Sequence, residues 1–122
     1  MKRNWDLIRE VLIEVEALDS ARFEEIQYGP ASGSSEPEKA AHGVLLWKAG
    51  YVEGADASSM SGDAVLAIGL TWAGHELLET IRSKAIWERI KTTAKDKGIE
   101  LTFDAVKALG SAALAAVVGG GG

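Results

Sequence analysis

The sequence predicts an α+β fold: a winged-helix-like domain that is mostly helical, with a two-stranded β-wing and extra C-terminal helices. Two observations predict it. An amphipathic helix opens the chain, and a strongly capped second helix is followed directly by two strand candidates with a loop between them. At this length we expect one domain over residues 1–118, followed by a flexible glycine tail over residues 119–122.

The first helix is expected over residues 5–18. Its apolar side chains recur at helical spacing, so they form one stripe that faces a core: Trp5, Ile8, Val11, Leu12, Val15 and Leu18. Asn4 is the expected N-cap, and Asp6 places a carboxylate in the first turn, where it suits the helix dipole. After this helix we expect an irregular chain over residues 19–34, with a short strand candidate over residues 23–28.

The second helix has a clear start signal. Ser35 and Glu38 match a capping box, and Pro37 lies in the first turn. Gly50 is the expected left-handed C-cap. Gly43 lies inside the helix, where glycine costs ~1 kcal/mol relative to alanine, so we expect another group to pack closely against it.

The wing and the C-terminal helices follow. Strand candidates over residues 51–53 and 63–70 enclose a loop rich in Ala, Ser, Asp and Gly. Three helices are expected after them, capped by Thr71, Ser83 and Thr102. The last helix carries valines and many alanines, so we expect it either to dock on the first helix or to form a homodimer.

The composition excludes several classes of protein. The chain has no cysteine, which excludes disulfides and thiolate chemistry and favours a cytoplasmic setting. No signal peptide is visible, and the longest apolar run, residues 108–118, is too short to span a bilayer, so we expect no membrane contact. The net charge of −5 disfavours a general nucleic-acid binder, because phosphate contacts need clustered cations.

Charge is distributed unevenly along the chain. Residues 14–38 hold seven acidic side chains against one arginine, and residues 82–97 hold six basic side chains against two acidic ones. Two solvated helix faces explain this pattern, and so does a molecule with an acidic and a basic side. At ~100° per residue, Lys84, Lys91 and Lys95 fall in one stripe, where Glu88 can pair with them.

The chain carries no recognisable catalytic or metal-binding motif. His42 and His75 are its only histidines, and the chain has no HxxxH, HxxE or HxxD pair. Ser58 lies near Asp56 in a loop, but without a nucleophile-elbow pattern. We therefore expect a non-enzymatic protein without a metal or a cofactor.

Two segments resemble a winged helix. Residues 45–54 (Leu-Leu-Trp-Lys-Ala-Gly-Tyr-Val-Glu-Gly) resemble the end of a recognition helix that enters the wing, and residues 70–78 resemble the helix after a wing. Further segments join them in resembling a family of short proteins classed as a domain of unknown function (DUF), found in phages, prophages and bacterial genomes: residues 1–3, 6–9, 56–58, 81–82 and Trp87. The resemblance covers nearly the whole chain and implies a fold and a mobile-element context, but no chemistry.

Two functions are therefore expected as alternatives. The first is a phage or prophage binding protein that acts by protein–protein interaction, as an adaptor or inhibitor of a host or phage factor. The acidic stretch over residues 14–38 motivates it, because an acidic face can engage a basic partner or mimic nucleic acid. The second is a DNA-binding winged-helix transcriptional regulator, by analogy of fold.

Seven residues are candidates for contact with a partner. On the second helix, Glu38, His42 and Lys48 are expected to be exposed. The four tryptophans are expected to pack in the core or at its boundary, with an exposed contact through Trp47 as the alternative. On the basic helix, the candidates are Lys84, Lys91 and Lys95, which would contact phosphates if nucleic acid is bound.

Overall fold

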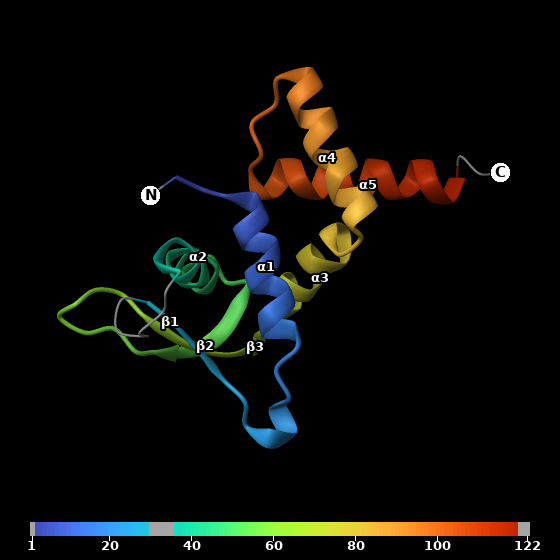
Figure 1. Cartoon of the computed structure of the whole chain (residues 1–122). Helices are drawn as coiled ribbons and strands as arrows, with labels where there is room; N and C mark the ends of the chain where they lie inside the picture. Colours follow the sequence, from blue (N-terminus) through green and yellow to red (C-terminus); the bar gives the residue numbers. More distant parts are fainter. Residues whose placement is uncertain (1, 30–35, 120–122) are drawn as a thin grey trace. The chain divides into compact units, whose positions relative to one another are not determined.

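The computed structural model describes residues 2–29 and 36–119, and the chain divides into two compact units, Met1–Glu76 and Leu77–Gly122 (Figure 1). The described residues form five α-helices, one short 3-10 helix and three β-strands. This confirms the expected α+β class. The single domain expected over residues 1–118 stays a prediction.

The first unit runs in the order helix, strand, helix and hairpin. Its elements, in chain order, are α1 (Trp5–Glu16), η1 (Ser20–Arg22), β1 (Ile26–Tyr28), α2 (Pro37–Lys48), β2 (Val52–Asp56) and β3 (Val65–Leu70). Helix α3 (Trp72–Ile81) begins in this unit, and the boundary between the units falls after Glu76.

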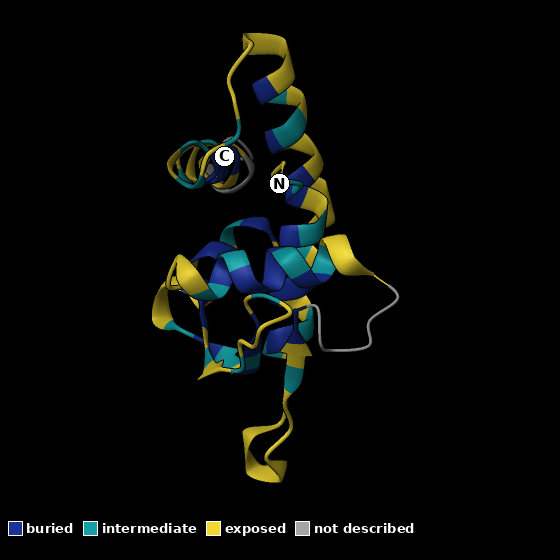
Figure 2. Ribbon diagram, turned by 90° about the vertical axis from the view of Figure 1, so that its left-hand side faces the viewer, coloured by how far each residue is buried: buried dark blue, intermediate teal, exposed yellow. Residues whose placement is uncertain are grey.

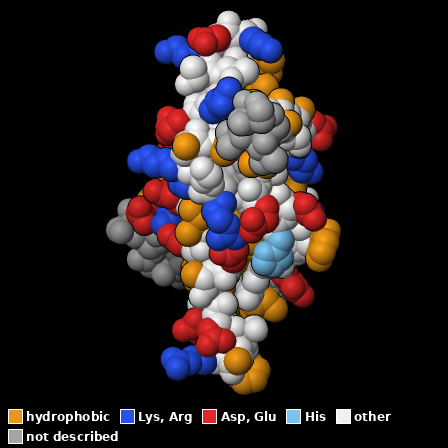
Figure 3. Space-filling view, turned by 90° about the vertical axis from the view of Figure 1, so that its right-hand side faces the viewer, with side chains coloured by type: hydrophobic (Ala, Val, Ile, Leu, Met, Phe, Trp, Pro, Cys, Tyr) orange, Lys and Arg blue, Asp and Glu red, His pale blue; other side chains and the backbone are white. Residues whose placement is uncertain are grey.

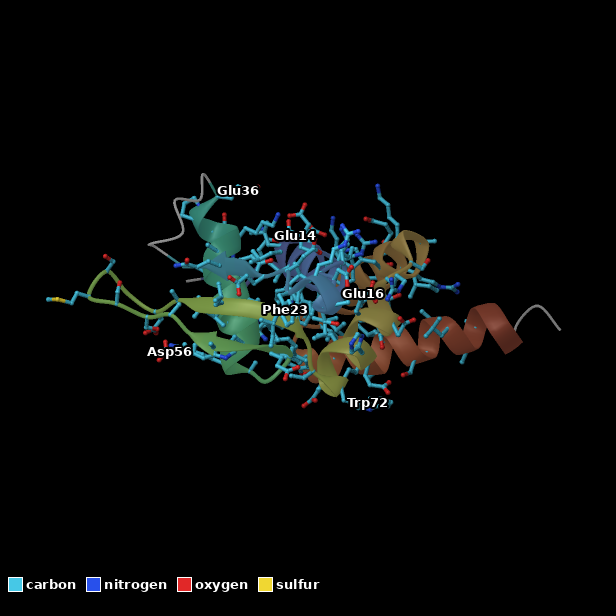
Figure 4. All side chains as sticks on the ribbon, turned by 90° about the horizontal axis from the view of Figure 1, so that it is seen from below. Glu14, Glu16, Phe23, Glu36, Asp56 and Trp72 are labelled. Carbon is cyan, nitrogen blue, oxygen red and sulfur yellow. The ribbon has the colours of Figure 1, made fainter. Side chains whose placement is uncertain are left out.

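The three strands form one antiparallel sheet in the order β1-β3-β2. The hairpin of β2 and β3 is the expected wing, and it pairs Val52 with Leu70 and Asp56 with Val65. Strand β1 adds a third strand, which is shorter than the candidate over residues 23–28. Helices α1 and α2 both pack on one face of this sheet (Figures 1 and 4).

Helix α1 buries the face that the apolar spacing predicts. Trp5, Ile8, Val11, Leu12 and Val15 are buried, and Figure 2 shows the buried face of the first unit against its exposed loops. The Asn4 side chain accepts hydrogen bonds from the backbone N–H groups of Asp6 and Leu7, which confirms it as the N-cap. The helix ends at Glu16, two residues before the expected end.

Gly43 of α2 lies directly against the aromatic ring of Tyr28. A Cβ atom at position 43 would lie 2.3 Å from Cγ of Tyr28, so only glycine allows β1 and α2 to approach this closely. The close packing expected at Gly43 is therefore confirmed.

The hydroxyl group of Tyr28 links three elements of the first unit. It donates a hydrogen bond of 2.9 Å to Oε1 of Glu14 on α1, while Nζ of Lys39 on α2 bonds to Oε2 of the same carboxylate. Lys39 also lies 3.7 Å from the carboxylate of Glu36. Tyr28 is buried and no described buried side-chain polar atom lacks a partner, so this network satisfies its polar groups where they leave water.

The ends of α2 agree with the sequence only in part. Ser35, half of the expected capping box, lies outside the described residues, and Glu36 occupies the N-cap position without a capping hydrogen bond from its side chain. Pro37 begins the helix as expected. Gly50 follows the helix with a φ of 87°, which confirms the left-handed conformation.

In the second unit, the rest of α3 is followed by α4 (Lys84–Lys97) and α5 (Phe103–Gly119). The expected caps form, because Ser83 accepts from the N–H of Ile86 and Thr102 accepts from the N–H of Ala105. Helices α4 and α5 pack together. At Gly110 an added Cβ would lie 1.9 Å from Cγ2 of Thr80, so α5 also touches the end of α3.

The C-terminus differs from the expected tail at one residue. Gly119 is the last residue of α5, whereas residues 120–122 lie outside the described part. No helix in the described part of the chain has the length and apolar character needed to cross a membrane.

The contact at Gly43 gives a testable prediction. Helix propensity alone favours Gly43→Ala by ~1 kcal/mol, but the new methyl group would overlap the Tyr28 ring. We therefore expect the substitution to lower the free energy of unfolding by about 1–3 kcal/mol, the usual cost of overpacking, as measured by urea denaturation. Gly69→Ala is the matched control, since a Cβ there meets nothing within 4 Å. Equal stability of both variants would contradict the assignment.

The Tyr28 network gives a prediction about alkaline pH. Burial, followed by the bond to Glu14, raises the pKa of Tyr28 above its ordinary value of 10.0. The bond to Glu14 likewise raises the pKa of Lys39 above 10.5. The folded state thus holds both protons more tightly than the unfolded state. This stabilisation is complete below about pH 10 and is lost as the pH rises further.

Tyr28→Phe removes one of the two groups. Its free energy of unfolding should fall with pH above 10 less steeply than that of the wild type, by up to about 1.4 kcal/mol per pH unit. Denaturant midpoints between pH 8 and 11.5 measure this. Parallel curves for the two proteins would rule out the tightly held phenol proton.

Candidate functional site

A groove of about 430 Å³ opens in the first unit, between the end of α1, the turn around η1, the strands β2 and β3, and the start of α3. We call it the acidic groove, because four glutamates contribute to its lining: Glu16, Glu24, Glu25 and Glu53. Among the described residues that line it, none is Lys or Arg. On the face drawn in Figure 3, acidic, basic and hydrophobic side chains all lie around a histidine.

The apolar part of the acidic groove includes Phe23, whose side chain is 88% exposed. Phe23 ends η1 with a φ of 55°, a left-handed conformation that is uncommon for a residue with a Cβ. Such strain costs of order 1–3 kcal/mol, and strained residues cluster at sites of function. Ile68 of β3 also lines the groove and is 46% exposed.

The turn that carries Phe23 is held in shape by local hydrogen bonds. The Asp19 side chain accepts from the N–H of Ala21, and Oε1 of Glu24 accepts from the N–H of Asp19 at 2.7 Å. Arg22 lies 3.6 Å from the carboxylate of Asp19. The cation next to Phe23 is therefore already paired within the turn.

A second large aromatic side chain is exposed close in sequence to a residue that lines the groove. Trp72 is 80% exposed in the first turn of α3, one helical turn before His75, which lines the groove. Figure 4, drawn from below, labels Trp72 together with Glu16 and Phe23. The expectation that all four tryptophans pack in the core or at its boundary is wrong for Trp72.

The candidate residues on α2 fall into different environments. Glu38 is exposed and Trp47 is half-buried. Lys48 is exposed but forms an ion pair with Asp63 of the wing loop. Glu38 and Lys48 lie near opposite ends of the helix, about 15 Å apart along its axis, so the structure does not bring them together.

His42 was expected on the exposed face of α2, and this expectation is wrong. The side chain is 0% exposed. Its Nε2 accepts a hydrogen bond of 2.8 Å from the backbone N–H of Asn4, and its Nδ1 lies 2.7 Å from the carbonyl oxygen of Glu38. The ring therefore joins α2 to the N-cap of α1, and a partner cannot reach it.

The candidate lysines on α4 are not equivalent. Lys84 and Lys95 are exposed, whereas Lys91 lies 3.1 Å from the carboxylate of Glu88 and 5.4 Å from the centre of the Trp87 ring. The expected pairing of Glu88 with the lysine stripe is confirmed for Lys91. The stripe thus offers two exposed ammonium groups instead of three.

The serine and aspartate weighed as a catalytic arrangement in the sequence have a structural role instead. Oγ of Ser58 bonds to the N–H and to the carbonyl oxygen of Ala64, and Asp56 accepts from the N–H of Ser58. These bonds shape the wing loop, and hydrogen bonds from the side chain and then the backbone of Ser58 lower the pKa of Asp56. No group of three or more potential metal ligands occurs among the described residues.

Sequence reasoning missed Phe23 and Trp72, although the position of each residue relative to its buried neighbours in the strand or helix period indicated that it is exposed. In a strand, alternate residues face opposite sides, so Phe23 falls out of phase with Ile26 and Tyr28. At ~100° per residue, Trp72 falls on the opposite side of its helix from Leu77, Leu78 and Ile81. These phases indicate exposure, but not what lies nearby.

Comparison with known proteins now identifies the family. The family described as "Hypothetical protein (DUF2513)" matches residues 2–100, which include every element through α4. An uncharacterized protein of Haemophilus influenzae is 43% identical over 107 residues, which are 88% of this chain and 90% of that protein. No solved structure matches the chain. With a match over most of its length, the chain belongs to the DUF2513 family.

Proposed function

We propose that the protein is a non-enzymatic, cytoplasmic binding module that acts by protein–protein interaction, as an adaptor or inhibitor in a phage or prophage setting. Its binding site is the acidic groove, and the partner presents a basic segment that also carries an apolar side chain. One observation supports this most strongly: an exposed aromatic side chain and four glutamates line one groove, and its described lining includes no Lys or Arg.

The negative charge of the groove favours a partner segment with positive charge. Its carboxylates lie around a concave surface, and concave surfaces lined by one sign of charge attract the opposite sign and speed association. Lys or Arg side chains therefore complement it, whereas nucleic acid and acidic peptides do not.

The exposed aromatic ring supplies an apolar contact. Side chains that dominate binding energy are enriched in aromatic residues, packed in pockets that exclude water. Phe23 has the required size, and the local bonds of its turn hold its backbone in a fixed position before any partner arrives. A rigid contact residue loses little conformational entropy on binding.

The alternative, a DNA-binding winged-helix regulator, finds less support in α2 and the wing. Both lysines of α2 already contact carboxylates, Lys39 with Glu14 and Lys48 with Asp63, and His42 is buried. The sequence has no Lys or Arg between residues 49 and 81, which include the whole wing. A wing without cations neutralises no phosphates.

Selection from a library of random dodecapeptides displayed on phage tests the proposal. We expect the selected sequences to be enriched in Lys and Arg around an apolar or aromatic residue. Their affinity for the double variant Glu25→Lys/Glu53→Lys should be lower by about tenfold or more, since reversing two rim charges replaces attraction by repulsion.

The double variant Asp96→Lys/Glu100→Lys is the matched control. It changes the net charge by the same amount at exposed positions outside the groove, so it should bind the selected peptides like the wild type. Failure to enrich basic peptides, or equal losses in both double variants, would overturn the proposal.

Electrophoretic titration with duplex DNA tests the alternative. Because Lys91 is engaged by Glu88, only two lysines of the α4 stripe can meet phosphates. We expect weak, sequence-blind binding with a log–log salt slope of about −1.8, from ~−0.9 per contact. The triple variant Lys84→Glu/Lys91→Glu/Lys95→Glu should abolish it. Tight, sequence-selective binding that survives this change would favour the regulator instead.

A further inference from the structure

Strand β3 extends beyond its pairing with β1. Residues 26–28 of β1 pair with residues 65–67, but β3 continues to Leu70. On its other side, β3 pairs with β2 as far as Leu70, with a register shift at Glu53 and Gly54 that leaves Ile68 without a partner there. Among the described residues, Gly69 and Leu70 therefore have a strand partner on the β2 side only, Ile68 has one on neither side, and all three of them line the acidic groove.

The chain leaves the sheet at this point because the turn around η1 holds it. The N–H of Glu24 bonds to the carbonyl oxygen of Asp19 at 3.2 Å, and the left-handed residue Phe23 directs the chain away. The backbone before β1 thus bonds within its own turn. If β1 were longer, its additional residues would pair with residues 68–70 of β3. The groove lies at that position instead.

We propose that the partner segment binds as an extended strand, added to β3 at residues 68–70 in line with β1. This inference rests on the proposed function and specifies how the basic segment is held. Backbone groups of the segment pair with the β3 edge, as in other complexes formed by strand addition. Its basic side chains meet Glu25 and Glu53, and its apolar side chain contacts Phe23.

Gly69 leaves space for the added strand. It lies in the middle of the exposed edge, and a Cβ there would meet nothing within 4 Å. Glycine inside a strand commonly marks a bulge or a place where another backbone approaches closely, and Gly69 lies next to the register shift at Ile68. A side chain at position 69 can therefore occupy the groove without a clash inside the protein.

Backbone methylation of the selected dodecapeptides tests strand addition on the full chain. Each peptide is made in two forms. One is N-methylated at its odd-numbered residues and the other at its even-numbered residues. A strand turns alternate N–H groups toward a given neighbour. One form should therefore lose about tenfold or more in affinity while the other stays within about twofold.

A groove-filling variant gives an independent readout. Gly69→Val should lower peptide affinity by about tenfold without lowering the melting temperature, whereas Ala85→Val, at an exposed position of α4, should change neither. In the complex, those backbone amides among residues 68–70 that face the open edge should show slowed hydrogen exchange by NMR.

The outcomes separate this inference from the proposed function. If basic peptides are selected and depend on Glu25 and Glu53, but both methylated forms bind alike, strand addition is wrong while the binding proposal stands. Full binding by Gly69→Val would also overturn strand addition. If no basic peptides are selected, the proposed function itself fails, and the strand model fails with it.

Discussion

The close contact between the ring of Tyr28 and the backbone of Gly43 is the constraint on which the first unit depends. It brings a three-residue strand against α2, and the hydroxyl of the same tyrosine reaches Glu14 on α1. A strand as short as β1 contributes few ladder bonds, so its position depends on this one side chain. With Tyr28 fixed at the far end of β1, the chain before Ile26 can leave β3 and open the acidic groove.

The sequence predicted the parts of the fold that local chemistry determines. The caps at Asn4, Ser83 and Thr102 depend on side chains that bond two or three residues ahead, so their residue types were enough to find them. The buried stripe of α1 follows from helical periodicity alone. The wing was recognisable because two strand candidates directly follow a helix with a glycine end.

The candidate site was harder to predict because its properties arise from contacts distant in sequence. His42 has the polar character of a surface residue, yet its partner is the N–H of Asn4, 38 positions away. Lys39 and Lys48 bond to carboxylates 25 and 15 positions away in the sequence, and no local pattern indicates these partners. Phe23 and β3 form one groove only because the sheet joins segments some 45 residues apart, which no local pattern specifies.

The unpaired edge of β3 has a further consequence for the protein when it is alone. An exposed strand edge is a template on which identical chains can pair and aggregate, and proteins commonly guard such edges with charge. Here Glu25 comes just before β1, on the open side of β3, and Glu53 lines the same groove from β2, so two copies meeting edge to edge would bring like charges into one groove. The carboxylates therefore oppose aggregation at high concentration. They attract a cationic strand to this edge but repel the same edge of a second copy of the chain.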